Sequence, residues 1–299
     1  MKKKAEITHP EKIYWPDEHI TKGELIDYYR NIAPYILPYM KNRPLSLRRQ
    51  PNGVKDEGFF QKDAGDSVPE WIKTVEILAE STGKMVNYHV VNDVESLLYI
   101  ANLGCIEMNP WNSTINKLDN PDYIVMDIDP SDKNTFDDVI DVALTIKQLL
   151  DEMGAEGFCK TSGASGMHVY IPFGKKYDYD QARDFAEMLA HMVTERLPEI
   201  TTLERSLSKR KNNQIYVDYL QNRIGQTLAC AYSARPKPGA TVSAPLEWSE
   251  VAHGLSPKDF TIKNIFDRLE KKGDLFKGVL GKGIQLNKVL QKLSVPEQD

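Results

Sequence analysis

The order of hydrophobic patterns between residues 123 and 220 constrains the fold more than any other feature of the sequence. Alternating apolar stretches predict short strands over residues 123–129, over "GFCKT" and "MHVYIPF", and over residues 214–220. Apolar residues at helical spacing predict helices over residues 135–153 and 179–197. The order β-α-β-β-α-β is that of the ferredoxin-like, or split βαβ, unit. The sequence therefore predicts an α+β protein in which two helices cover one face of a four-stranded antiparallel sheet.

Three acidic residues interrupt the first and last strands of this unit. Asp127 and Asp129 lie one residue apart in "YIVMDIDPSD", and Asp218 lies in "QIYVDYL". In the usual strand order the first strand lies between the third and the fourth, so the acids and His168 of the third strand are expected to meet on the helix-free face. Converging carboxylates need cations beside them. The sequence leaves two interpretations open: salt bridges to Lys and Arg, or bound divalent metal ions.

A metal site here would suit phosphoryl transfer. Carboxylate oxygens favour Mg²⁺ or Mn²⁺. Two such ions about 3.5–4 Å apart activate an attacking oxygen and stabilise the leaving oxygen. In this interpretation Asp127 and Asp129 bridge both ions, and Asp218 holds the ion that activates the nucleophile.

The segment "KTSGASGMH" adds a candidate anion site. Gly163 and Gly166 would let backbone N–H groups approach a phosphate, while Ser162 and His168 would add donors. A nucleoside triphosphate is the natural ligand beside paired metal ions. An ordinary hairpin turn is the alternative interpretation.

Charge is distributed unevenly along the 299 residues. The net charge of −5 disfavours a chain that coats nucleic acid nonspecifically. Residues 41–62 nevertheless hold six basic and two acidic residues, and residues 201–240 hold seven basic and two acidic residues. These stretches predict a localised anion-binding surface, with ordinary solvated surface as the alternative. No apolar run approaches the roughly 20 residues of a membrane span, and the scattered cysteines favour a reducing cytoplasm over a zinc or disulfide framework.

The N-terminal part predicts a mixture of helices and strands. Thr21 and Glu24 form a capping-box pattern ahead of apolar periodicity, which predicts a helix that Pro34 and Pro38 break. The segment "RPLSLRRQPNGV" predicts a strand that runs into a Pro-Asn-Gly turn.

Taken in order, several motifs resemble one family. The motifs "DIDP", "SGASGMH", "VDYLQN" and "YSARPKPGATVSAPLEW" are similar to those of the polymerase domain of bacterial DNA ligase D, a branch of the archaeo-eukaryotic primase-polymerase superfamily. The resemblance continues upstream through "EKIYWPDEHITKGELIDYY", "RPLSLRRQPNG", "GFFQKDA" and "CIEMNPW", and so spans about residues 8 to 270. It implies a single primase-polymerase domain over residues 1–299, with a ferredoxin-like or RRM-like catalytic sheet and an N-terminal α/β subdomain. Its parts would be a DNA-end-binding part (1–115), a palm-like catalytic part (120–245) and a C-terminal helical extension (246–299).

The resemblance also implies a function. Such a chain would be a template-dependent nucleotidyltransferase of non-homologous end joining, which fills gaps and extends annealed DNA ends with NTPs or dNTPs. Mn²⁺ or Mg²⁺ would be the cofactor, two ions at a time, with Mn²⁺ favoured and ribonucleotides often preferred. Its DNA would carry gaps, overhangs or 5′-phosphate ends. Ku, an ATP-dependent ligase and a phosphoesterase would be separate chains, and the setting would be the nucleoid in a prokaryotic cytoplasm, without a membrane.

Residue roles follow from the resemblance position by position. Metal ligands would be Asp127, Asp129 and Asp218; contacts to the triphosphate would be Ser162 and His168, with Arg235 and Lys237 near the nucleotide phosphates or the primer end; 5′-phosphate contacts would be Lys12 and Lys22; and aromatics stacking on template bases would be Phe59 and Phe60. Membership of a buried core pair is the alternative for one of the two phenylalanines.

Two positions depart from the family pattern. Asn109 in "EMNPW" stands where relatives commonly carry His, and Ser165 replaces a frequent Lys. The departures put a nucleotide or metal-shell contact and one phosphate charge in doubt, while the three acids are intact.

Two other functions fit some of the same residues. The acids would also serve a metal-dependent phosphodiesterase or nuclease, because a metal-bound water can be the nucleophile. Lys12, Lys22 and the aromatic pair would also serve a catalytically silent DNA-end-binding module. Primer extension, primer degradation and binding without turnover separate the three hypotheses.

Overall fold

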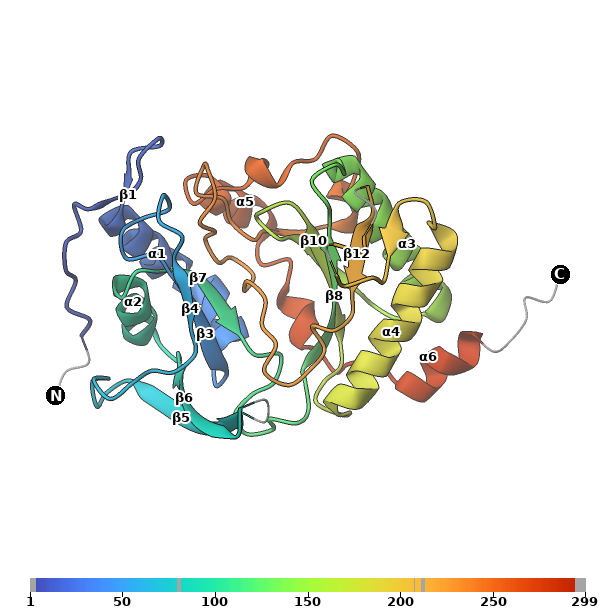
Figure 1. The fold of residues 1–299 in the computed structure, drawn as a ribbon, viewed down its shortest axis with the longest axis horizontal. Helices are drawn as coiled ribbons and strands as arrows, with labels where there is room; N and C mark the ends of the chain where they lie inside the picture. Colours follow the sequence, from blue (N-terminus) through green and yellow to red (C-terminus); the bar gives the residue numbers. More distant parts are fainter. Residues whose placement is uncertain (1–3, 80–81, 207, 211–212, 294–299) are drawn as a thin grey trace. The chain divides into compact units, whose positions relative to one another are not determined.

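The computed structural model describes residues 4–79, 82–206, 208–210 and 213–293, and the chain divides into two compact units (Figure 1). The division is discontinuous in sequence. The first unit comprises Met1–Asn116, Gly225–Ala244 and Pro257–Asp274; the second comprises Lys117–Ile224, Pro245–Ser256 and Leu275–Asp299. Within the described ranges, no helix combines the length and the apolar character that a bilayer crossing requires.

The second unit is built on a six-stranded sheet in the order β11-β12-β8-β10-β9-β13. Its strands are β8 (Tyr123–Asp129), β9 (Phe158–Thr161), β10 (Met167–Pro172), β11 (Thr201–Thr202), β12 (Ile215–Asp218) and β13 (Pro245–Leu246). Its helices are α3 (Phe136–Met153), α4 (Tyr179–Arg196) and α6 (Leu286–Leu293), with short 3₁₀ turns η1 (Trp248–Glu250) and η3 (Lys277–Leu280).

The predicted β-α-β-β-α-β topology is confirmed in this unit. β8 pairs antiparallel with β12 on one side and with β10 on the other, and β10 pairs antiparallel with β9. α3 and α4 lie on one face of this sheet (Figure 1). Ile124, Met126 and Ile128 are fully buried. The residues between them therefore face the other, helix-free side.

The two long helices begin where their caps predict. Thr135 and Asp178 each accept a hydrogen bond from the backbone N–H three residues on and complete a capping box. Such caps satisfy backbone donors that the first helical turn leaves unpaired.

The first unit combines a five-stranded sheet with helices packed beside it. Its elements are β1 (Ile13–Trp15), β2 (Ile20–Thr21), α1 (Lys22–Met40), β3 (Pro44–Arg49), β4 (Phe59–Gln61), β5 (Lys73–Ala79), β6 (Lys84–Val90), α2 (Val94–Asn102), β7 (Cys105–Pro110), the 3₁₀ turn η2 (Pro257–Asp259) and α5 (Ile265–Lys272). β3 is central and pairs with β4, β6 and β7. The predicted strand before the Pro-Asn-Gly turn is confirmed as β3.

The prediction that prolines break the first helix is wrong. α1 continues through Pro34 and Pro38 to Met40, after the predicted capping box of Thr21 and Glu24. Both prolines lie on the exposed side of the helix, where water can take up the carbonyl groups that lose their N–H partners. The opposite side is a buried apolar stripe, whose burial outweighs the cost of about 3 kcal/mol per proline.

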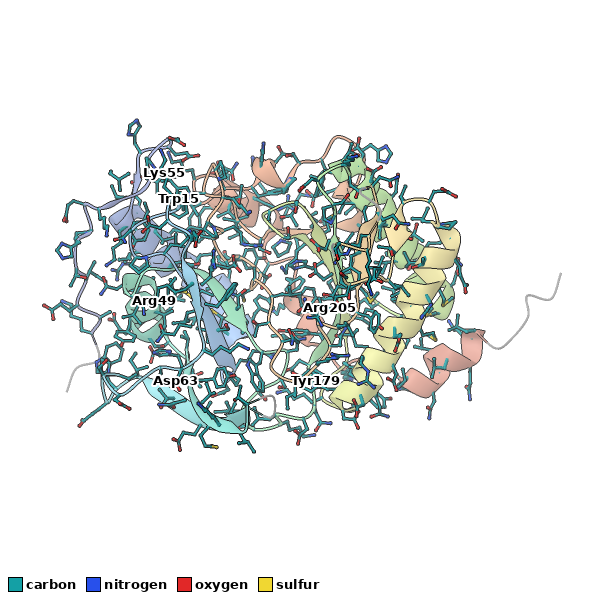
Figure 2. The ribbon with its side chains drawn as sticks, in the orientation of Figure 1. Trp15, Arg49, Lys55, Asp63, Tyr179 and Arg205 are labelled. Carbon is teal, nitrogen blue, oxygen red and sulfur yellow. The ribbon has the colours of Figure 1, made fainter. Side chains whose placement is uncertain are left out.

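Long-range contacts explain why residues 225–244 belong to the first unit. The fully buried Trp15 donates its indole N–H to the Lys237 carbonyl over 2.9 Å (Figure 2). The buried Tyr28 hydroxyl donates to the Tyr232 carbonyl over 2.6 Å. Buried tyrosine and tryptophan need partners for their polar atoms, and these bonds supply them.

Candidate functional site

A cross-strand row of four side chains runs over the helix-free face of the second unit's sheet. In the strand register Asp218 of β12 pairs with Asp127 of β8, Asp127 with His168 of β10, and His168 with Lys160 of β9. Paired residues of neighbouring strands share a face. His168 Nε2 lies 3.4 Å from Asp127 Oδ1. The structure thus brings two of the predicted acids and the predicted histidine together.

Asp129 lies one pleat further along β8, on the same face as the row. Its Oδ2 is 3.4 Å from Nη1 of Arg210, whose guanidinium covers the Tyr216 ring at 4.3 Å from its centroid. Burial raises the pKa of the Asp129 carboxyl, while the Arg210 charge opposes that rise. Arg210 was not among the predicted site residues, because only the fold shows that the segment before β12 approaches the end of β8.

Asp218 is held from the segment that follows it. Its carboxylate accepts hydrogen bonds from the Leu220 backbone N–H at 2.8 Å and from Gln221 Nε2 at 2.9 Å. Within the described residues, no three His, Cys, Asp or Glu side chains are arranged to hold one ion as they stand. The three acids nevertheless supply the hard oxygen donors that Mg²⁺ and Mn²⁺ take. Their present partners are cationic or donor groups, so the donor set fits divalent ions in chemistry.

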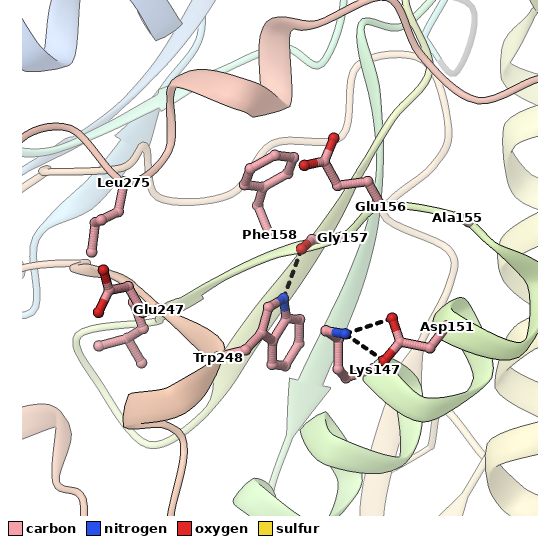
Figure 3. Close-up of a pocket in the computed structure, with 10 residues that line it drawn as sticks. Lys147, Asp151, Ala155, Glu156, Gly157, Phe158, Glu247, Trp248 and Leu275 are labelled. Atoms are coloured by element: carbon pink, nitrogen blue, oxygen red, sulfur yellow. Dashed lines mark hydrogen bonds and ion pairs between the residues drawn. The ribbon is translucent and has the colours of Figure 1, made fainter.

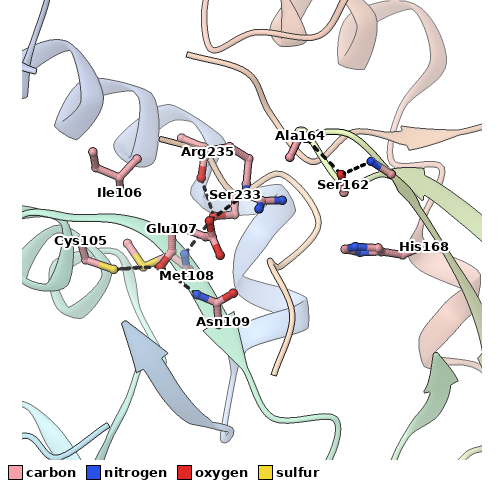
Figure 4. Close-up of polar contacts among 12 residues, drawn as sticks. Cys105, Ile106, Glu107, Met108, Asn109, Ser162, Ala164, His168, Ser233 and Arg235 are labelled. Atoms are coloured by element: carbon pink, nitrogen blue, oxygen red, sulfur yellow. Dashed lines mark hydrogen bonds and ion pairs between the residues drawn. The ribbon is translucent and has the colours of Figure 1, made fainter. Parts of the chain in front are cut away.

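The hairpin turn between β9 and β10 is closed by its own serine. Ser162 Oγ accepts hydrogen bonds from the Ala164 and Gly166 backbone N–H groups, each at 3.1 Å (Figure 4). These two N–H groups are thus hydrogen-bonded within the turn, while the approach of Gly163 and Gly166 to a phosphate stays a prediction. A Cβ at Gly166 would lie 2.1 Å from the Ile128 carbonyl oxygen, so glycine is required there by close packing on β8. Ser165 is exposed.

An amide side chain completes β8 where β12 has ended. Asn222 Oδ1 accepts from the Val125 N–H at 2.8 Å, and Asn222 Nδ2 donates to the Val125 carbonyl at 2.7 Å. At Val125, two residues before Asp127, the Asn222 side chain thereby makes the backbone hydrogen bonds that a paired strand would otherwise make. The motif "VDYLQN" contains this residue, yet its role depends on a contact 97 residues away.

In the first unit, the two predicted 5′-phosphate lysines come together. The Lys22 backbone N–H donates to the Lys12 carbonyl over 2.8 Å. Lys12 Nζ contacts Asn52 Oδ1 at 2.6 Å, and Lys22 Nζ donates to the Thr8 carbonyl at 2.8 Å. Burial, together with the nearby Lys12 charge, lowers the pKa of the Lys22 ammonium group. A bound anion beside the two lysines would relieve the effect of the Lys12 charge on Lys22.

The two predicted aromatics are exposed rather than buried. Phe59 and Phe60 on β4 are 47% and 59% exposed, so the alternative of a buried core pair is wrong. The guanidinium groups of Arg49 and Arg48 lie 5.3 and 5.0 Å from their respective ring centroids. Exposed rings beside arginines suit stacking on nucleic-acid bases.

Arg235 is held by an acid that the sequence did not single out. Its Nε donates to Glu107 Oε2 over 2.8 Å, and both side chains are largely buried (Figure 4). Asn109, also on β7, donates to the Glu107 carbonyl over 3.2 Å. Lys237 is exposed on the same segment as Arg235. All four residues belong to the first unit.

A cavity of about 380 Å³ lies elsewhere in the second unit (Figure 3). Trp248 donates its indole N–H to the Gly157 carbonyl there, and Lys147 forms an ion pair with Asp151. The described residues that line this cavity include none of the predicted site residues. Asp127, Asp218 and His168 lie instead in the charged row on the helix-free sheet face.

Comparisons with known proteins identify the family of this chain. The family model described as the LigD primase-polymerase domain matches residues 21–276. The chain is 35% identical to the bifunctional non-homologous end joining protein LigD of Bacillus subtilis over 272 residues, which are 90% of this chain and 43% of that protein. It is 29% identical to the multifunctional protein LigD of Mycolicibacterium smegmatis over 91% of this chain and 35% of that protein.

A solved structure shares the fold. The polymerase domain from Mycobacterium tuberculosis ligase D, in complex with DNA, superimposes with a TM-score of 0.86 at 24% identity, over 95% of this chain and 100% of that chain. This chain spans less than half the length of the two LigD relatives. Because the family model covers most of the sequence, the chain belongs to the LigD primase-polymerase domain family.

Proposed function

We propose that this chain is a template-directed nucleotidyltransferase that fills gaps and extends annealed DNA ends in non-homologous end joining. The observation that carries the proposal is the row in which Asp218, Asp127 and His168 lie side by side on the helix-free sheet face, with Asp129 one pleat away. Carboxylates that can hold divalent ions, next to a side chain that can donate a hydrogen bond to a phosphate, are what nucleotidyl transfer requires.

In the proposed reaction, a primer 3′-hydroxyl oxygen attacks the α-phosphorus of the incoming nucleotide and loses its proton. The new P–O bond extends the primer, and the bond between the α-phosphorus and the bridging oxygen breaks to release pyrophosphate. Asp127, Asp129 and Asp218 would hold two Mn²⁺ or Mg²⁺ ions, which, when bound, polarise the reacting oxygens. His168 and Ser162 would orient the triphosphate from the neighbouring strand and turn.

The residues of the first unit supply the proposed DNA contacts. The paired Lys12 and Lys22 would bind a 5′-phosphate, and Phe59 and Phe60 would stack on template bases. Arg235, fixed by Glu107, and the exposed Lys237 would contact nucleotide phosphates or the primer end. Ribonucleotides as preferred substrates belong to the same proposal, as do Ku, an ATP-dependent ligase and a phosphoesterase as partners in the nucleoid.

A primer-extension assay tests the proposed function. The wild type, given a gapped primer-template with a 5′-phosphate, Mn²⁺ and either NTPs or dNTPs, is expected to extend the primer. Asp127→Asn keeps the shape of the side chain but removes its charge, and is expected to lower the rate by more than about 100-fold, as loss of a preorganised electrostatic group does. Asp132→Asn, an exposed acid just after β8, is the matched control and is expected to keep full activity.

Other outcomes would contradict the proposal. Equal rates of primer extension by wild type and Asp127→Asn would show that the Asp127 carboxylate is not needed for the reaction. Shortening of the primer without nucleotide addition would identify a nuclease, and 5′-phosphate-dependent binding without turnover in either metal would identify a binding module.

A further inference from the structure

The cross-strand row begins with a lysine that the proposed reaction does not use. Lys160 on β9 is fully buried, although lysine is seldom buried without a specific partner. In the register it lies between His168 of β10 and Pro245 of β13. A buried ammonium group costs several kcal/mol of desolvation. Its position in the row, next to His168, indicates that the buried ammonium group serves a contact with that histidine.

Lys160 contacts the histidine ring directly. Its Nζ lies 2.7 Å from His168 Nδ1 and 5.5 Å from the centroid of the Tyr170 ring. An ammonium group is a donor and has no lone pair to accept with. With Lys160 in its charged form, Nδ1 of His168 acts as the acceptor and the ring proton lies on Nε2. Nε2 is the nitrogen that faces Asp127 Oδ1 at 3.4 Å.

We propose that Lys160 is a positioning residue that fixes His168 in the Nε2–H tautomer and in one ring orientation. The inference rests on the proposed function, because the group that would use this N–H is a nucleotide phosphate or the Asp127 carboxylate. Without Lys160, only the Asp127 carboxylate, 3.4 Å from Nε2, favours a proton on that nitrogen, so the Nδ1–H tautomer gains population. The ring would then present a lone pair to an anionic ligand for part of the time, and repel it.

The same contact adds charge to the site. The row reads cation, imidazole, carboxylate, carboxylate across four adjacent strands. Because the imidazole lies between Lys160 and Asp127, it transmits a hydrogen bond from the buried cation toward the acids. A hydrogen bond to a charged group is typically worth about 1.5–3 kcal/mol, which corresponds to a change of about 10- to 100-fold in affinity.

Nitrogen NMR of the full, nucleotide-free chain tests the tautomer directly. In ¹⁵N-histidine-labelled wild type at mildly alkaline pH, His168 is expected to show an unprotonated Nδ1 and a protonated Nε2. The spectrum of His168→Gln assigns the signal among the six histidines. In Lys160→Met the His168 signals are expected to move toward a mixture of tautomers. A wild-type His168 that carries its proton on Nδ1 overturns the proposal without any variant.

Kinetics separate positioning from a purely structural role. Lys160→Met is expected to lower kcat/KM for the nucleotide by about 10- to 100-fold, mainly through KM. In a His168→Gln background the same change is expected to add no more than about 2-fold, because the two residues then act through one contact. Additive losses in the two backgrounds would show that Lys160 acts independently of His168.

Two controls keep the outcomes distinct. Lys147→Met, on the covering helix α3, is the matched control and is expected to change neither the His168 signals nor KM. If Lys160→Met does not fold, Lys160→Arg retains a cation that can only donate and is expected to keep the Nε2–H tautomer, and loss of that tautomer there would count against the proposal. Failure of the wild type to extend primers would refute the proposed function, whereas the nucleotide-free spectrum decides the role of Lys160 alone.

Discussion

A single buried polar residue can make the stability of this chain depend on pH. His89 on β6 is only 1% exposed, and neither ring nitrogen has a hydrogen-bond partner among the described residues. Burial, with a smaller contribution from the Arg49 charge, lowers the pKa of His89 to about 4, while Asp63 opposes the shift. The folded protein therefore holds this histidine neutral at pH values where the unfolded chain would protonate it.

This residue predicts acid lability. Its stabilising contribution is complete above the unfolded pKa of about 6.5 and is lost as the pH falls from there to about 4, because the unfolded state takes up the proton first. Between pH 7.5 and pH 5 the loss amounts to about 2 kcal/mol. Urea unfolding at both pH values is expected to show that loss in wild type and to show it reduced by this amount in His89→Leu. His191→Leu, an exposed histidine, is the control, and an unchanged pH dependence in His89→Leu would refute the assignment.

The sequence was enough to identify the acidic candidate residues, but not to predict which side chains contact one another. The acids were identifiable because a charged residue is conspicuous in an apolar strand. Lys160, Glu107, Arg210 and Asn222 were missed because each gains its role from a contact across the fold; Glu107 and Arg235, for example, are separated by 128 residues in sequence. Ser162 was found, but its engagement with its own turn depends on backbone geometry that composition does not encode.

At the scale of elements, the hydrophobic periods predicted most of the second unit's sheet. The ranges of β8, α3, β9, β10, α4 and β12 agree with prediction to within two residues at each end, because apolar residues recur along these elements at helix or strand spacing. β11 and β13, of two residues each, were too short to give a pattern. α1 was mispredicted because local proline rules do not register which side of a helix is buried.

The turn between β9 and β10 predicts a sharp difference between neighbouring positions. Gly166→Ala would place a methyl group against the Ile128 carbonyl, on the strand that carries Asp127. We expect a loss of about 1–3 kcal/mol in the free energy of unfolding, as for overpacked cores, together with reduced extension activity. Chemical denaturation and primer extension measure the two effects. Ser165→Ala, one residue earlier and exposed, is expected to change neither, and equal stability of the two variants would contradict the packing argument.

At the scale of the whole molecule, the candidate chemistry is divided between two units that the sequence interleaves. The acids, Ser162 and His168 belong to the second unit, while Lys12, Lys22, Phe59, Phe60 and Arg235 belong to the first. Because a net charge of −5 disfavours general attraction to DNA, the proposed DNA binding would depend on local cationic and aromatic groups. Substitutions in the first unit are therefore expected to weaken DNA binding, and substitutions of the acids in the second unit to lower catalysis.

A double variant tests that separation. Phe59→Ala/Phe60→Ala is expected to weaken binding to gapped DNA by about 1–3 kcal/mol for each stacked base, because both rings are exposed and available. Its thermal stability is expected to stay close to that of wild type, since little apolar area leaves a core. Fluorescence anisotropy and thermal unfolding measure the two quantities. Leu144→Ala, an exposed apolar residue on α3, is the control; a large loss of stability in the double variant would show a packing role.

In the row across the sheet, the strand register that aligns the site residues is the same register that buries the apolar core residues. Side chains alternate along each strand, so a slip of β10 by one residue would bring Met167 or Val169 to the open face and turn His168 toward α3 and α4. The same slip would remove an apolar residue from the interior. A register shift that misaligns the site therefore also destabilises the fold. Insertions or deletions that preserve function are expected in the connecting segments and not within β12, β8, β10 and β9.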